Sequence, residues 1–260
     1  MNLSVGSLDI EFMHGKGETD DHTWAWIPSQ KTLVTGDLVI WVFPNAGNPQ
    51  KVQRYPLEWA ASLRQMMTYG AELLLPAHGL PIAGKNRINR VLGDIANVLE
   101  KLVSDTLDLM NRGEQLNNII HEVKVDKDLL ELPWLKPLYD EPEFVVRNIW
   151  RMYGGWWDAD PASLKPSPQK ALAEEIVSLT GGVNKLVERA VALAAEGNLR
   201  LSCHLIEFAA ESAPNDKKVH GARSEIYRLR RSAESSLMSK GIFAAAMRES
   251  EQIVQSSQGD

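Results

Sequence analysis

Four short segments within the first 84 residues carry the side chains that could do chemistry. They are HGKGETDDH (14–22), TGD (35–37), NAGNPQKVQR (45–54) and LLPAHG (74–79). Glu18, Asp37 and His78 each lie near glycine or proline, where a strand is expected to end and a loop to begin. Carboxylate oxygen and imidazole nitrogen suit zinc at a catalytic site, and a bridging carboxylate can hold two metals about 3.5–4 Å apart. Taken singly, each residue is more often a turn or solvated residue, but the combination favours a metal-dependent hydrolase site.

Residues 1 to about 84 must supply the framework for these side chains, and their pattern predicts an α/β fold. The apolar patterns predict strands over 3–12, 22–27 and 32–40, a helix over 56–70, and a short buried strand followed by a loop over 71–78. The segment 28–31 has the residues and the length of a hairpin turn. Pro56 begins the predicted helix and Gly70 follows its end, which is the usual asymmetry. This order of hairpin, helix, strand and histidine loop is typical of layered α/β hydrolases.

From Lys85 onward the sequence becomes helical. A long periodic helix ends at Gly113, and residues 126–143 form a proline-containing connector. Further helices are predicted over 144–155, 167–179, 182–197, 199–214 and 216–241. Their spacing resembles tetratricopeptide-like helical hairpins, although no strict repeat exists. The tail 251–260 is expected to fray.

The overall composition excludes several classes of protein. A net charge of −6 argues against a nucleic-acid partner. No apolar run approaches the roughly 20 residues of a membrane span, so no membrane partner is expected. The first residues lack a signal peptide, which favours a cytoplasmic location unless such a peptide lies upstream. The single cysteine, Cys203, excludes a disulfide framework and a cysteine-rich zinc site, and we expect it in the core.

The stretch from Gly17 to His78 resembles the second half of a metallo-β-lactamase-fold hydrolase. In that pattern Asp37 matches the bridging aspartate and His78 the last histidine, while Glu18 falls where an earlier histidine is usual. A glutamate there is similar to the alkylsulfatase branch. The segment GWWDADPA (155–162) resembles the core of the stretch that opens the alkylsulfatase dimerisation domain.

The resemblance carries several expectations. It implies a partial metallo-β-lactamase αββα layer over residues 1–92, followed by an all-α dimerisation domain over 93–260. It implies a zinc-dependent hydrolase, with two zinc ions per complete site and Glu18, Asp37 and His78 as metal ligands. It also implies a homodimer that acts on a small-molecule ester, either a sulfate ester or a related ester. Asn45 and Arg54 fall where alkylsulfatases place polar residues that meet the sulfate, and an arginine fork suits such an oxyanion.

Two departures from the family pattern keep other functions open. None of the six histidines forms the HxHxDH motif, which in the family would precede Met1. Phe144 stands where alkylsulfatases carry a histidine. One alternative is therefore a catalytically incomplete C-terminal fragment that acts as a dimerisation module. Another is a helical binding module over 85–260 that presents a groove to a peptide.

One further group of residues has two interpretations. Four tryptophans lie around the connector, at positions 134, 150, 156 and 157. They either line an apolar slot for an alkyl chain or, as the spacing favours, pack in the core.

Overall fold

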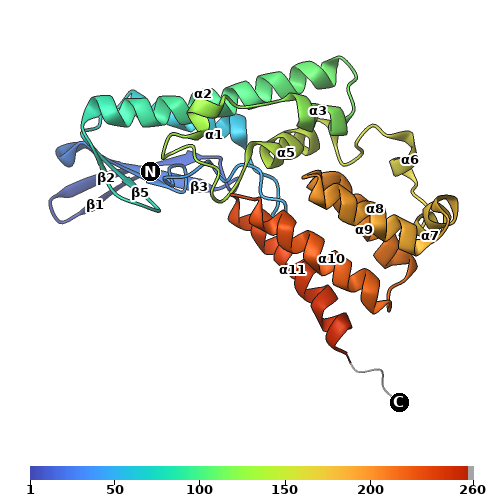
Figure 1. The fold of residues 1–260 in the computed structure, drawn as a ribbon. Coiled ribbons are helices and arrows are strands. Elements are labelled where there is room, and N and C mark those ends of the chain that lie inside the picture. The colour runs from blue at the N-terminus through green and yellow to red at the C-terminus, as the bar shows by residue number, and fades with distance from the viewer. Residues whose placement is uncertain (257–260) are drawn as a thin grey trace. The chain divides into compact units, whose positions relative to one another are not determined.

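The computed structural model describes residues 1–256, and its contacts divide the chain into two compact units (Figure 1). We call Met1–Asp160 the sheet unit and the part from Pro161 onward the helical unit. The domain boundary predicted between residues 92 and 93 falls inside the long helix α2 (Lys85–Asn111). The assignment of two family domains with that boundary therefore stays a prediction.

A six-stranded sheet with the order β1-β2-β3-β4-β5-β6 forms the base of the sheet unit. The strands are β1 (Asn2–Val5), β2 (Leu8–Gly15), β3 (His22–Ile27), β4 (Thr32–Gly36), β5 (Leu73–Pro76) and β6 (Ile82–Ala83). All neighbouring pairs are antiparallel except β4 and β5, which are parallel. Strands β2, β4 and β5 therefore run in the same direction, and their carboxyl ends meet at one edge of the sheet.

Two strand predictions need correction. The strand expected over 3–12 is a hairpin, because Gly6 adopts a left-handed conformation (φ 61°) that turns β1 back onto β2. The strand expected over 32–40 ends at Gly36 (φ 53°) instead. The predicted hairpin between β3 and β4 is confirmed, and a short 3₁₀ turn over Pro28–Gln30 makes the connection.

Five α-helices complete the sheet unit. They are α1 (Pro56–Met67), α2, α3 (Leu116–Glu122), the one-turn α4 (Lys127–Leu130) and α5 (Pro142–Gly154). Helices α1 and α2 contact the sheet, and α3 and α5 pack against α2. The predicted helices over 56–70 and 87–113 correspond to α1 and α2. Trp24, Leu33 and Leu74 on the sheet join Trp59 and Leu92 on the helices in one core. Each fully buried side chain of this size contributes about 1.5–3 kcal/mol, so the core fixes the sheet edge that carries the candidate site.

The helical unit contains six helices in its described part. They are α6 (Pro161–Leu164), α7 (Gln169–Thr180), α8 (Val183–Ala195), α9 (Leu199–Ser212), α10 (Lys217–Ser232) and α11 (Leu237–Gln255). Their core gathers Leu186, Ile206, Val219 and Ile226. The small sheet followed by many helices confirms the coarse fold prediction, whereas tetratricopeptide-like packing stays a prediction.

Two helix predictions for the helical unit also need correction. The helix expected over 216–241 is two helices, because Ser236 caps the start of α11 by accepting a hydrogen bond from the Ser239 N–H. The tail expected to fray from residue 251 is helical as far as Gln255. Residues 257–260 of that tail lie outside the described part of the chain.

The tryptophans around the connector differ in how deeply they are buried, and Cys203 is partly buried. Trp150 is buried in the core and Trp134 packs against it, whereas Trp156 is 73% exposed. Burial raises the pKa of Cys203 to about 11, which fits a packing residue rather than a reactive thiol.

Across residues 1–256, none of the helices combines the length and apolar character needed to cross a membrane.

Candidate metal and substrate pocket

Three strand ends bring the predicted site residues to one edge of the sheet. Glu18 lies in the turn after β2, Asp37 directly follows β4, and His78 lies two residues beyond β5. Because these strands run in the same direction, their carboxyl ends share an edge, where ligands commonly bind in α/β folds. The predicted position of each residue at a strand end is thus observed.

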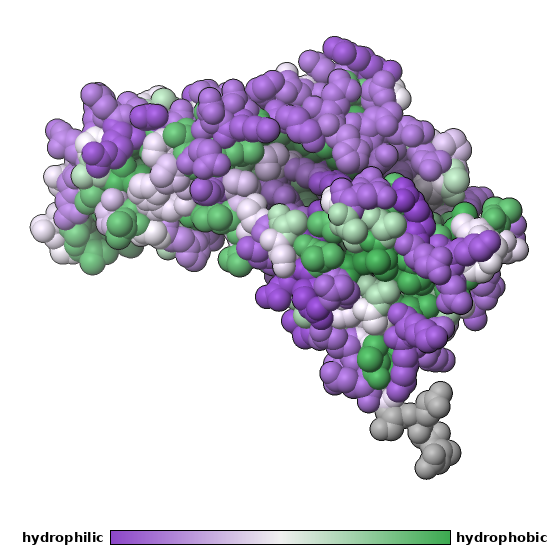
Figure 2. All heavy atoms as spheres, in the orientation of Figure 1, coloured by the Kyte–Doolittle hydropathy of each residue, from purple (hydrophilic) through white to green (hydrophobic). Residues whose placement is uncertain are grey.

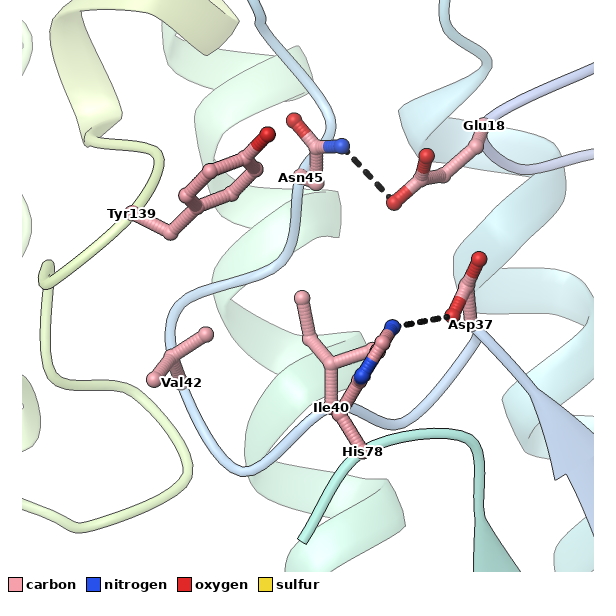
Figure 3. A pocket seen from close by; sticks show the side chains of 7 residues that line it. All are labelled: Glu18, Asp37, Ile40, Val42, Asn45, His78 and Tyr139. Atoms are coloured by element: carbon pink, nitrogen blue, oxygen red, sulfur yellow. Dashed lines mark hydrogen bonds and ion pairs between the residues drawn. The ribbon is translucent and has the colours of Figure 1, made fainter. Parts of the chain in front are cut away.

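Asp37 and His78 form a pair. The His78 Nε2 lies 3.3 Å from the Asp37 Oδ1 (Figure 3). Gly36 makes this arrangement possible because a Cβ there would lie 2.6 Å from the His22 Nε2, and its φ of 53° disfavours other residues. A tight glycine turn therefore aims Asp37 at the loop that carries His78.

Glu18 has different partners. Asn45 Nδ2 donates to its Oε1 at 2.8 Å, and Arg54 Nη1 lies 3.3 Å from its Oε2 and also donates to its backbone oxygen. Burial raises the pKa of Glu18, while the Asn45 hydrogen bond and the Arg54 charge oppose this rise. The His22 side chain also opposes the rise through its charge.

Arg54 is buried, with a side-chain exposure of 6%. Its backbone N–H donates to the Asn148 Oδ1, and its carbonyl accepts from the Asn148 Nδ2. Helix α5 thus holds Arg54 against Glu18. Arg54 does not line the pocket described next, so its expected contact with substrate stays a prediction.

These residues surround a pocket of about 480 Å³ (Figure 3). Its lining residues are Glu18, Asp37, Ile40, Val42, Asn45, His78 and Tyr139. The sequence did not indicate Ile40, Val42 or Tyr139, because their positions depend on how the 37–55 loop and the connector fold over the strand ends. The pocket combines polar groups at the sheet edge with an apolar wall.

The pocket has side chains of the kinds that bind metal ions, but they are not all arranged around one position. Its two carboxylates and one imidazole are donors that suit zinc. Among residues 1–256, however, no three His, Cys, Asp or Glu side chains lie close enough together to hold an ion. Asp37 and His78 converge, whereas Glu18 is turned toward Asn45 and Arg54. Glu18, Asp37 and His78 thus line one pocket but do not form a three-ligand cluster, and their role as metal ligands stays a prediction.

Phe144 packs away from this pocket. It lines a separate cavity of about 200 Å³ with Gly47, Arg147 and other residues of α5 and the adjacent loop. Phe144 therefore does not line the candidate pocket.

Comparison with known proteins identifies the relatives of this chain. It is 24% identical over 231 residues to a linear primary-alkylsulfatase from a Pseudomonas species, matching 88% of this chain and 44% of that protein. It is 25% identical over 226 residues to an alkyl/aryl-sulfatase of Saccharomyces cerevisiae, matching 85% of this chain and 34% of that protein. The chain thus spans less than half the length of these relatives.

A solved structure shows the same fold. The stereoselective inverting sec-alkylsulfatase Pisa1 from Pseudomonas sp. matches with a TM-score of 0.88 and 22% identity, over 96% of this chain and 40% of that one. The family model described as alkyl sulfatase dimerisation matches residues 115–252, just over half of the chain. The chain therefore belongs to the alkyl sulfatase dimerisation family.

Proposed function

We propose that this chain contributes to a metal-dependent hydrolase that cleaves sulfate esters or related esters. One observation carries the proposal: Glu18, Asp37, His78 and Asn45 line the same pocket although they come from four separate segments. The relatives support it, since their names include primary, secondary and aryl sulfatases. Because the chain spans less than half of their length, the full activity is proposed for a larger catalytic assembly.

Asp37 and His78 would provide two metal ligands and Glu18 a third. When bound, zinc would lower the pKa of a coordinated water toward neutrality. A complete two-metal site would need further ligands besides these three. Asn45 fixes the Glu18 carboxylate and also faces the pocket, so it is the group best placed to meet an oxyanion. Ile40 and Val42 would contact the apolar part of the ester.

We also propose that the chain forms a homodimer. The family match covers most of the helical unit, and Figure 2 shows apolar residues at the surface of this unit over α8 and α9. Val191 on α8 is 48% exposed and Leu201 on α9 is 44% exposed. An exposed apolar patch of this kind commonly marks a protein interface.

A second function has its own support. With no three-ligand cluster in residues 1–256, the chain could act as a catalytically incomplete dimerisation module. In that case Glu18 serves as the partner of Arg54, and the Asp37–His78 pair is a remnant of a larger site.

Metal content separates the two functions. Zinc would be measured by plasma mass spectrometry in the wild-type chain, in Asp37→Ala, and in His121→Ala as a control at an exposed histidine outside the pocket. The hydrolase proposal expects bound zinc that is lost in Asp37→Ala and kept in the control. It also expects the larger assembly that contains this chain to hydrolyse primary alkyl, secondary alkyl or aryl sulfate esters. A dimer by light scattering with no zinc and no turnover supports the module instead.

A further inference from the structure

A fully buried carboxylate, Asp140, lies next to the candidate pocket without lining it. The side chain has no exposed surface, and it accepts hydrogen bonds from three backbone N–H groups. Gly47 and Asn48 donate to its Oδ2 at 2.6 and 3.1 Å, and Glu141 donates to its Oδ1 at 2.7 Å. Burial raises its pKa to about 7, although the three amides oppose the rise. Because burying a carboxylate costs folding free energy, we expect Asp140 to hold a particular segment of the chain in place.

The segment it holds is the loop that carries Asn45. Gly47 lies directly against the first turn of α5, because a Cβ at this position would be 2.4 Å from the Phe144 carbonyl carbon. Asn48 has a φ of 32°, a conformation that asparagine tolerates better than most residues. The carboxylate thus anchors a loop whose backbone has little freedom of its own.

A chain of hydrogen bonds leads from this anchor into the pocket. The Asn48 Nδ2 donates to the Asn45 Oδ1 at 3.2 Å, and the Asn45 Nδ2 donates to the Glu18 Oε1 at 2.8 Å. On its other side, Asp140 directly follows Tyr139, which lines the pocket opposite Glu18 (Figure 3). One buried side chain is therefore connected to two walls of the pocket.

We infer that Asp140 is a positioning residue that fixes the Asn45 carboxamide and the Tyr139 wall of the pocket through the amides of Gly47 and Asn48. The inference rests on the proposed function only in treating Asn45 as a group that meets the ester. It does not depend on bound metal, because each contact is made within the chain.

The test follows Asn45 by nuclear magnetic resonance in the 260-residue chain. In Asp140→Ala, we expect hydrogen exchange of the Gly47 and Asn48 amides to accelerate by about tenfold or more, as for loss of a charge-assisted hydrogen bond. The Asn45 side-chain amide signals should move toward those of a free carboxamide. Asp140→Asn keeps one acceptor oxygen and should restore part of the protection. The control is Asp126→Ala, which removes a carboxylate–backbone bond at an exposed cap of the same connector.

A second variant covers the case in which Asp140→Ala does not fold. Asn48→Gly tolerates the positive φ and removes only the side chain that reaches Asn45. It should change the Asn45 side-chain signals while the Gly47 amide stays protected. Unchanged Asn45 signals in both Asp140→Asn and Asn48→Gly would overturn the inference, as would equal acceleration at amides of the central sheet. A chain that shows the expected shifts but binds no zinc would refute only the hydrolase proposal.

Discussion

The buried Asp140 carboxylate should make the stability of the sheet unit depend on pH. Its pKa rises from 3.8 to about 7 in the folded chain because of burial. The folded state therefore binds a proton more tightly than the unfolded state over this interval. By linkage, the contribution of this group is fully present below the unfolded pKa and is lost as the pH rises through the folded pKa.

The size of the effect follows from the shift. Each pH unit between the two pKa values costs about 1.4 kcal/mol of unfolding free energy. From about pH 5 to pH 8 the wild type should lose about 2–3 kcal/mol relative to Asp140→Asn, which cannot ionise. The neighbouring Glu141 adds to the cost of the ionised form. Comparison with the asparagine variant removes the contributions of other titrating groups.

Tryptophan fluorescence during urea unfolding is the suitable assay. All eight tryptophans lie between residues 24 and 157, so the signal reports only the sheet unit. Asp126→Asn, at an exposed helix cap of the same connector, is the matched control. If the free-energy difference between wild type and Asp140→Asn is constant with pH, or varies as much in the control, the assignment of a raised pKa to Asp140 is refuted.

Four further substitutions test separate parts of the structure. Arg223→Met removes a buried guanidinium that bonds to the Glu207 and Glu249 carboxylates. It should destabilise the helical unit by about 2–4 kcal/mol in thermal melts followed by circular dichroism. Gly47→Ala places a Cβ against the α5 backbone and should lower the urea midpoint of the sheet unit. Gly221→Ala, with open space in α10, should instead stabilise the helical unit by about 0.5–1 kcal/mol. Glu18→Gln should destabilise the sheet unit by about 1–3 kcal/mol in urea unfolding, because a buried arginine charge loses its ion pair; an unchanged midpoint would refute this pairing.

The sequence predicted well those features that depend on local pattern. The apolar stripe of α1, its proline start and the glycine stop of α2 are local signals, and both helices form where expected. The break between α10 and α11 was missed because a serine cap can end one helix and start another without glycine or proline. Likewise, the residues at the three strand ends could be predicted to share a pocket. Contacts across long stretches of chain, such as Asp140 with Gly47, leave no periodic signal.

Glu18 shows why a motif alone does not determine what a residue does. The Arg54 guanidinium is buried, so the fold must provide its charge with an anion, and Glu18 is that anion. Arg54 is therefore paired with Glu18 and does not line the pocket. The Asn45 carboxamide, by contrast, faces the pocket and holds the same carboxylate through its Nδ2. If the proposed hydrolase function holds, binding of the ester should therefore depend more on Asn45, and on the loop that Asp140 anchors, than on a direct arginine fork.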